Sequence, residues 1–313
     1  MPGIRLAIFA CRNFNTDQEA MDEVKAMRII VGYNGSDASK AAITDLHNSG
    51  FGDNTEVLVL TVAEEWSYPR TLDEAQLIAD AAKEEIERVF PAWAVAAEVA
   101  SGSPPRELLA RAASFHPDLI VVGEPRHDLS EHNLFVGHTS HVLLTESNCS
   151  VRIARGDRRS EAHPQKIIVG FDGSVGATLS VEAIASRRWT PGTAVQLLAV
   201  ADASVLSLIG RFNPQMRGAA VETKFASQWA ETLASRSLAK LERSGIASSV
   251  AVLLGHPKEV IIQEAERLDA DAIFVGPHCS SNSFERFLIG IVSASVAARA
   301  HCSVEVVRQP ETW

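Results

Sequence analysis

The sequence predicts an α/β protein with two similar domains, each a five-stranded parallel sheet with helices on both faces. Three observations lead to this prediction. Apolar runs of about six residues alternate with longer stretches of helical period along each half of the chain. Runs such as DLIVVG and DAIFVG are apolar at nearly every position, as in parallel strands that helices cover on both sides. The two halves of the 313-residue chain also align with each other.

In the first half, strands and helices are expected in the order βαβαβαβαβ. The strands are predicted near residues 28–32, 56–62, 93–100, 118–123 and 150–154. Between them, SKAAITDL, EAQLIADAAKEEIERVF and PPRELLARAASF place Ala, Ile and Leu three and four residues apart. This spacing puts the apolar side chains on one face of each helix, and that face is expected to pack on the sheet.

The second half repeats the first with two successive offsets. The stretch IIVGYNGS at Ile29–Ser36 returns 138 residues later as IIVGFDGS at Ile167–Ser174. Further along, DLIVVG at Asp118–Gly123 returns 153 residues later as DAIFVG at Asp271–Gly276. The second half therefore carries 15 extra residues, which we place at Ser204–Gly218 because that stretch contains Gly and Pro and is of mixed polarity.

The repeat divides the chain. We expect one domain at 27–155 and a second at 165–313, joined by a linker at 156–164 within the charged segment RGDRRSEAHPQ. Residues 1–26 have no counterpart in the repeat, and they are interpreted as an N-terminal extension, with a pairing strand and a misassigned start as open alternatives.

Composition narrows the functional classes. A net charge of −10 and a pI near 5.5 argue against nucleic acid or an anionic membrane as a partner, because both would repel the chain. The four cysteines form no CxxC pair, and the apolar run near Met1 is too short for a membrane span or a signal peptide. A cytoplasmic location is therefore expected.

A ligand is expected at one edge of each sheet. In open parallel sheets, ligands bind beyond the carboxyl ends of the strands, at the point where the strand order reverses. In the first half this point is marked by Asn34, Val62 and the loop from Gly123 to Gly137. In the second half it is marked by Asp172, Val200 and the loop from Gly276 to Gly290.

An ordered set of motifs, present twice, resembles the universal stress protein family. The set comprises the opening IIVGxxGS, the block GxPxxxLLxxAxxxxxDLIVVG, and a closing CSV strand with Arg155 or Arg308 after it. The resemblance covers roughly 27–155 and 165–308. It implies a tandem universal stress protein with two Rossmann-like (adenine nucleotide alpha hydrolase-like) domains. The implied sheet order is 3-2-1-4-5, with the domains paired about a pseudo-two-fold axis through their fifth strands.

In one branch of this family, the resemblance implies ATP binding, with Mg where ATP is bound. An Asp at the end of strand one meets ribose, and a Val on strand two lies by adenine. A loop of the form GxxG, nine residues, then Gly and Ser or Thr holds the phosphates. The implied nucleotide-binding residues of the second half are Asp172, Val200, Gly276, Gly290 and Ser293. Those of the first half are Asn34, Val62, Gly123, Gly137, Thr139 and Ser140.

Both halves depart from that pattern. In the second half, Cys279 stands at the second glycine and Ile291 at the hydroxyl residue. In the first half, Asn34, Arg126 and His138 replace the Asp, the second glycine and the hydroxyl residue. A side chain obstructs the close backbone approach that glycine permits, and isoleucine has no donor for an oxygen. We therefore expect the first half to be the degenerate copy.

Two serines leave alternatives open. Ser140 and Ser293 lie three residues beyond the last glycine of each loop. Either they donate to a phosphate, or they are polar residues in the first turn of a helix.

No metal site or catalytic residue is predicted. The loop EPRHDLSEHNLFVGHTSH contains four histidines among Asp128 and Glu131, namely His127, His132, His138 and His141. The histidine cluster lacks HExxH or CxxC spacing and belongs to one half only, since the repeat has no histidine at the equivalent positions, so a solvated polar loop is favoured over a metal site. The chain has no GxSxG or GxxxxGK[ST] motif, and a structural role is favoured for Cys279 over a reactive thiol.

Three functional hypotheses follow from the resemblance. The first is a cytoplasmic stress-response or regulatory protein that binds an adenine nucleotide in its second domain and needs no turnover. The second is an interaction or scaffold protein of the same fold that binds no nucleotide. The third, slow ATP hydrolysis, has less support because no general base is visible in the sequence. The chain is expected to form an intrachain pseudo-dimer, with a further homodimer and a protein partner left open.

Overall fold

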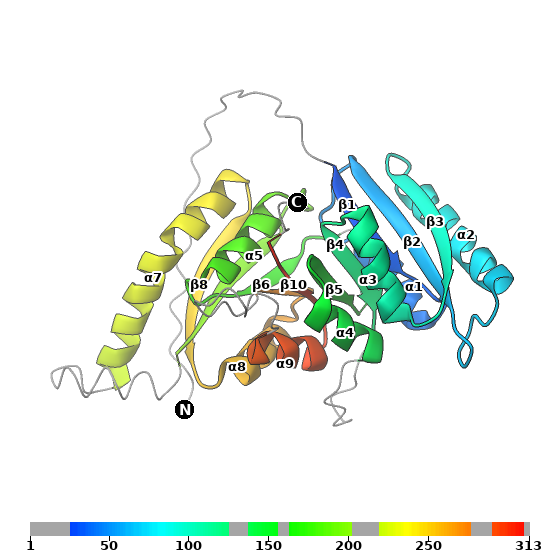
Figure 1. Ribbon diagram of the computed structural model, residues 1–313. Coiled ribbons are helices and arrows are strands. Elements are labelled where there is room, and N and C mark those ends of the chain that lie inside the picture. The colour runs from blue at the N-terminus through cyan, green and yellow to red at the C-terminus, as the bar shows by residue number, and fades with distance from the viewer. Residues whose placement is uncertain (1–25, 125–136, 156–162, 202–218, 277–289, 310–313) are drawn as a thin grey trace. The chain divides into compact units, whose positions relative to one another are not determined.

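The computed structural model describes residues 26–124, 137–155, 163–201, 219–276 and 290–309 (Figure 1). These residues divide into two compact units, and each is built around one copy of the repeat. The first unit contains β1–β5 and the second contains β6–β10. Nearly all of the predicted N-terminal extension, linker and 15-residue insertion lies outside the described residues.

The first unit has the predicted parallel sheet. Its strands are β1 (Met27–Gly32), β2 (Thr55–Ala63), β3 (Ala94–Ser101), β4 (Leu119–Gly123) and β5 (Ser150–Ala154). All neighbouring strands run parallel, in the order β3-β2-β1-β4-β5. The order that the resemblance implied is confirmed. The chain crosses from one side of β1 to the other between β3 and β4, so the carboxyl ends of β1 and β4 form the switch point of this sheet.

The second unit repeats this sheet. Its strands are β6 (Lys166–Gly170), β7 (Ala194–Ala201), β8 (Ala247–Leu254), β9 (Ala272–Val275) and β10 (Ser303–Val306). The order is β8-β7-β6-β9-β10, again with parallel neighbours. The equivalent switch point therefore lies at the carboxyl ends of β6 and β9.

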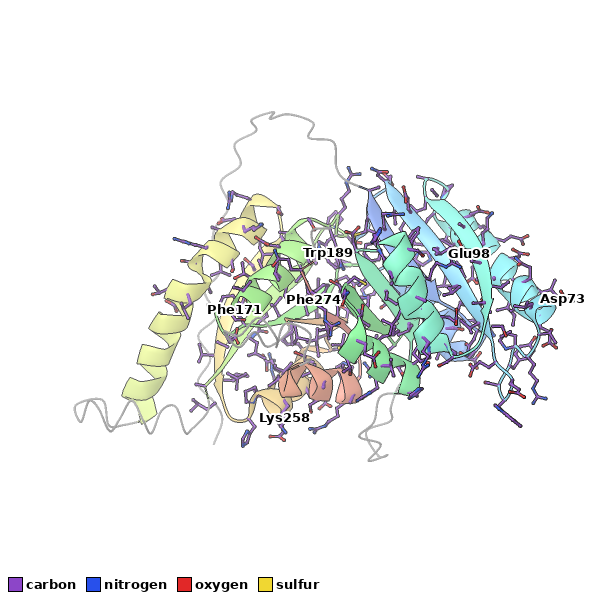
Figure 2. All side chains as sticks on the ribbon, viewed as in Figure 1. Asp73, Glu98, Phe171, Trp189, Lys258 and Phe274 are labelled. Carbon is purple, nitrogen blue, oxygen red and sulfur yellow. The ribbon has the colours of Figure 1, made fainter. Side chains whose placement is uncertain are left out.

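Helices cover both faces of each sheet, as predicted (Figure 1). In the first unit, α1 (Asp37–Leu46) and α2 (Leu72–Val89) pack on one face, and α3 (Pro104–Phe115) and α4 (His138–Glu146) on the other. In the second unit, α5 (Val175–Ala185) and α7 (Ala219–Arg243) share one face, and α8 (Pro257–Leu268) and α9 (Ile291–Arg299) share the other. Phe274 of β9 is fully buried, whereas Asp73 of α2 is exposed to solvent (Figure 2).

Local sequence explains where several helices begin and end. Thr71 and Glu74 form a capping box at the start of α2, in which each side chain accepts a hydrogen bond from the backbone of the other. Prolines occupy the first turn of α3 and α8, where their missing N–H costs no helical hydrogen bond. Both of these helices end at a non-glycine residue in the left-handed region, His116 (φ 49°) and Asp269 (φ 50°). The two repeats therefore also have the same backbone conformation at the end of this helix.

A buried ion pair ties α1 to β5 in the first unit. Arg152 Nε lies 2.5 Å from Asp45 Oδ2, and both side chains are almost fully buried. A second contact of 3.1 Å makes the pair bidentate. Burial of two charges is tolerated because they are paired and hydrogen-bonded. An apolar cluster packs on the same face of the sheet, and Phe90 and Trp93 stack there 3.8 Å apart between ring centroids.

None of the helices in the described part of the chain combines the length and apolar composition needed to cross a bilayer.

Candidate functional site

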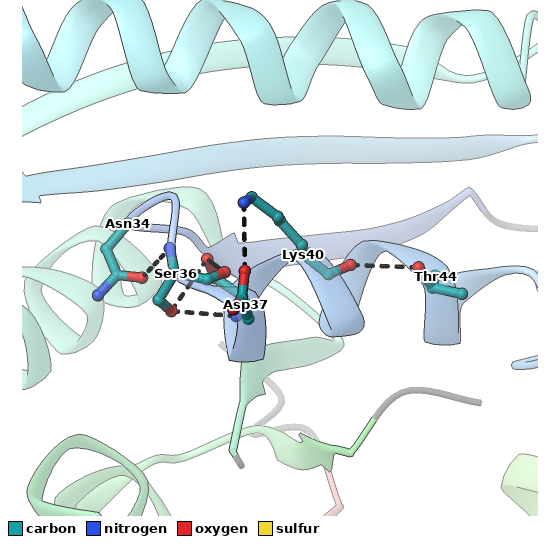
Figure 3. A network of polar contacts seen from close by, with 6 residues as sticks. Asn34, Ser36, Asp37, Lys40 and Thr44 are labelled. Atoms are coloured by element: carbon teal, nitrogen blue, oxygen red, sulfur yellow. Dashed lines mark hydrogen bonds and ion pairs between the residues drawn. The ribbon is translucent and has the colours of Figure 1, made fainter. Parts of the chain in front are cut away.

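The repeated stretch after the first strand of each unit forms the same turn. In the first unit, the backbone N–H of Ser36 donates to Asn34 Oδ1 at 3.1 Å (Figure 3). In the second, the backbone N–H of Ser174 donates to Asp172 Oδ1 at 2.9 Å. Amide and carboxylate oxygens both accept this bond, so the turn does not distinguish Asn from Asp. The difference that remains between the two turns is charge.

The other residues of this motif also have local roles. Gly35 and Gly173 have φ of 77° and 78°, in the left-handed region that favours glycine. The hydroxyl of Ser36 then accepts from Ser39 N at the start of α1. The hydroxyl of Ser174 caps α5 in the same way. The motif therefore has a structural explanation, a turn that leads directly into a capped helix.

The glycine that ends the fourth strand of each unit permits a close backbone approach. A Cβ on Gly123 would lie 1.9 Å from the carbonyl oxygen of Ala38 in α1. A Cβ on Gly276 would lie 2.2 Å from the carbonyl carbon of Gly176 in α5. Neither distance is possible for a real side chain, so these glycines are needed for helix packing whether or not a ligand binds.

A cavity lies at the predicted edge of each sheet. The first has a volume of about 220 Å³ and the second about 420 Å³. All of the predicted residues of the first half line the first cavity, namely Asn34, Val62, Gly123, Gly137, Thr139 and Ser140. All of those of the second half line the second, namely Asp172, Val200, Gly276, Gly290 and Ser293. The structure thus brings each set together, while their roles toward a ligand stay predictions.

The second cavity combines an apolar wall with a few polar groups. The apolar wall includes Phe171, Leu198, Val200, Ile261 and Val275. Polar side chains come from the turn after β6 and from the first turn of α9. Its volume falls within the range of about 300–1,000 Å³ that is typical of small-molecule pockets. The Ser293 hydroxyl donates to the Gly276 carbonyl at 2.8 Å, so it is engaged within the wall.

The first cavity contains a buried carboxylate that the sequence analysis missed. Glu124 directly follows β4, and the residue is only 8% exposed. Its Oε1 accepts from Gly137 N at 3.0 Å and from the Ser140 hydroxyl through a shorter bond. A signal existed in the sequence, because the repeat places Pro277 at the equivalent position. We did not consider that an acidic residue follows the fourth strand in only one of the two halves.

Burial also affects a tyrosine of the first cavity. Desolvation raises the pKa of the Tyr33 hydroxyl above its ordinary value, and the nearby Glu85 carboxylate raises it further. The hydroxyl therefore remains a protonated donor at neutral pH.

The remaining candidates fall largely outside the described residues. These are His127, His132, Asp128, Glu131, Arg126 and Cys279. His138 and His141 lie on α4, and within the described ranges no group of three or more His, Cys, Asp or Glu side chains is placed to hold a metal ion. Of the cysteines, Cys149 and Cys302 are buried, and burial raises the pKa of the Cys149 thiol.

Comparison with protein-family models identifies the chain. The model of the universal stress protein family matches twice, at residues 25–155 and at residues 164–308. The chain belongs to the universal stress protein family. Its two family domains agree with the tandem arrangement that the repeat predicted. No protein among the curated ones matches the chain.

Two solved structures show the same fold over most of this chain, and a third is similar to part of it. A universal stress protein from Archaeoglobus fulgidus DSM 4304 is 18% identical, with a TM-score of 0.58, and the match covers 91% of this chain and 99% of the other. A functionally unknown protein from Pseudomonas aeruginosa PAO1 is 14% identical, with a TM-score of 0.57, covering 92% of this chain and 94% of the other. An Arabidopsis thaliana family protein with AMP bound is 16% identical, with a TM-score of 0.32, covering 42% of this chain and 93% of the other.

Proposed function

We propose that this tandem universal stress protein is a regulatory binding protein whose second unit takes an adenine nucleotide, without turnover. The observation that carries the proposal is that Asp172, Val200, Gly276, Gly290 and Ser293 line one cavity of about 420 Å³. These are the positions at which the ATP-binding branch of the family is expected to hold its ligand.

The chemistry of this cavity suits the three parts of a nucleotide. The Asp172 side chain is exposed, and its carboxylate can accept from ribose hydroxyls in addition to closing the turn. The apolar wall suits the faces of a purine. Helix α9 begins at the cavity, and the backbone N–H groups of its first turn would favour a phosphate.

Calorimetry tests this proposal. We expect the chain to bind AMP, ADP or ATP with one site per chain, and Asp172→Ala to weaken that affinity at least about tenfold, as loss of a hydrogen bond to a charged group does. Asn34→Ala is the matched control, because it removes the equivalent turn bond from the first unit. An unmodified chain that binds none of the three nucleotides at millimolar concentration would contradict the proposal.

An interaction protein is the second candidate, and one observation favours it. Among the described residues, seven large apolar side chains are exposed, and four of them lie close in sequence, at Trp66, Tyr68, Leu72 and Leu77. Contiguous exposed apolar side chains mark interaction surfaces, and this segment is the contact surface that the second candidate function would use. A nucleotide-independent partner whose binding is lost in Trp66→Ala but retained in Asp172→Ala would support this function over the first.

Other expectations stay proposals. They are a stress-response role, a cytoplasmic location, Mg with bound ATP, and pairing of the two domains as a pseudo-dimer. The hypothesis of slow ATP hydrolysis would be supported by measurable ATP turnover that Asp172→Ala abolishes.

A further inference from the structure

Glu124 places a negative charge where the first cavity meets the start of a helix. The residue follows β4 and lines the cavity together with Gly137 and Ser140, which lie at the start of α4. Its carboxylate accepts hydrogen bonds from both of them. The contact is close, because a Cβ on Gly137 would lie 2.6 Å from Glu124 Oε1.

The surroundings favour an anion at this position. The first backbone N–H groups of a helix have no partner within the helix, and the helix dipole makes this end positive. A buried carboxylate is tolerated only where such groups pair with it. Glu124 is buried, and both of its bonds to α4 come from the N-cap and the first turn. Glu124 therefore uses the donors that a ligand phosphate would otherwise use.

The second unit differs at the equivalent residues. Ser293 corresponds to Ser140 in the repeat, but its hydroxyl donates to the Gly276 carbonyl rather than to a carboxylate. The residue that corresponds to Glu124 in the sequence is Pro277, which has no acidic group. The second cavity also has nearly twice the volume of the first.

We propose that Glu124 is a specificity-determining residue that acts as an internal anion and excludes phosphate-bearing ligands from the first cavity. The inference rests on the proposed function for the identity of the excluded ligand. It gives two causes for the expected difference in ligand binding between the repeats. The first repeat lacks some of the residues that the family pattern has, and it also carries one side chain that supplies a negative charge.

The test uses the full chain with Asp172→Ala, so that the second cavity binds nucleotide more weakly, and each further variant is compared with this parent chain. Into this background we introduce Glu124→Ala or, as the matched control, Glu64→Ala. Glu64 is another acid on the wall of the first cavity, so both variants lose the same charge. Among the described contacts, the Glu64 side chain makes no bond to α4, so only Glu124→Ala frees the donors of that helix. Calorimetry measures inorganic phosphate, AMP and adenosine with each chain, and circular dichroism confirms folding.

The expected result is selective. Glu124→Ala should tighten binding of phosphate and AMP at least tenfold and leave adenosine unchanged, whereas Glu64→Ala, which leaves Glu124 bonded to the start of α4, should give a much smaller gain for phosphate and AMP. Equal gains for adenosine and AMP would overturn the proposal, because they would show that the variant only enlarges the cavity. No gain for phosphate or AMP would overturn it as well.

A second variant guards against loss of folding. Glu124→Gln retains an oxygen that accepts from Gly137 and Ser140 but removes the charge, so we expect it to fold and to bind phosphate more tightly than the parent chain. If it folds and does not bind phosphate more tightly than the parent chain, the proposal is wrong.

The phosphate measurement does not depend on adenine recognition. A chain that binds no nucleotide at Asp172 but gains phosphate in Glu124→Ala would therefore refute the proposed function and support this inference.

Discussion

At the scale of single residues, the two repeats have the same backbone conformation at the turn after the first strand and differ in the charge of their side chains. Asn34 and Asp172 close the same turn, and Gly35 and Gly173 have nearly the same φ. Beyond the fourth strand, Glu124 bonds to the start of the next helix in the first unit, and its counterpart Pro277 has no acid. Each repeat thus has one acidic side chain at its switch point that the other lacks. In the second unit the acid is exposed, and in the first it is buried.

Gly123 provides a prediction at this scale. We expect Gly123→Ala to destabilise the chain by about 3 kcal/mol, because the added Cβ would overlap the Ala38 carbonyl and force the backbone to shift. Gly52→Ala is the control, since its Cβ would have ordinary contacts at 3.9 Å. Urea denaturation of both variants measures the effect. Equal stability of the two variants would contradict the packing role of Gly123.

At the scale of elements, helix starts determine much of the local structure. The helices α1 and α5 begin with a serine cap after the shared turn, and α4 and α9 begin with a glycine N-cap at the cavity. A glycine cap provides no side-chain acceptor for the first N–H groups, which therefore stay available to another acceptor. In α4, the Glu124 carboxylate supplies it.

The capping box of α2 predicts a pH dependence. The backbone N–H groups of Arg70 and Thr71 donate to Glu74 and lower its pKa below the ordinary value. Because the folded-state pKa is lower than the unfolded one, the stabilisation is present above the unfolded pKa of about 4.3 and is lost as the pH falls through the folded pKa.

Glu74→Gln tests this dependence. The difference in unfolding free energy between the unmodified chain and this variant should shrink as the pH falls from the unfolded pKa of about 4.3 through the lower folded-state pKa, because the carboxylate becomes protonated first in the unfolded and then in the folded state. Chemical denaturation at pH 3 and pH 7 measures it, with Glu84→Gln of the same helix as the control. A difference that is equal at both pH values would contradict the prediction.

At the scale of the whole molecule, the chain contains one fold twice, with two unequal cavities. Because the repeats have the same strand order and similar helix ends, a ligand effect in one unit can be compared with the same segment of the other. This internal comparison separates binding from general stabilisation.

Hydrogen exchange makes that comparison. With AMP present, we expect slower exchange at residues 171–177 and 290–296, which border the second cavity. The equivalent residues 33–39 and 137–143 should be unchanged, because the first cavity holds its own anion. A bound ligand stabilises the closed state of its site, so the site opens less often and its amides exchange more slowly. Protection of the first unit instead of the second would contradict both proposals.

Much of the fold could be predicted from the sequence. The predicted strand at 150–154 matches β5, and the helix within PPRELLARAASF matches α3 residue for residue. Burial on both faces makes parallel strands continuous apolar runs, so their positions are visible in the sequence. The cavity residues were also predicted, because strand ends at a switch point meet in space. Glu124 was missed, since its partner Ser140 lies 16 residues away and only folding brings the two together.

The sequence by itself determined that the chain is a duplicated α/β protein of this family. Those properties depend on periodicity and on motifs whose residues are neighbours in the chain, such as Asn34 with Ser36 and Asp172 with Ser174. Only the tertiary structure decided that Gly123 is needed for packing, that the two cavities differ in size, and that Glu124 fills the start of α4. These properties depend on distances between atoms of different elements, and local sequence does not encode such distances directly.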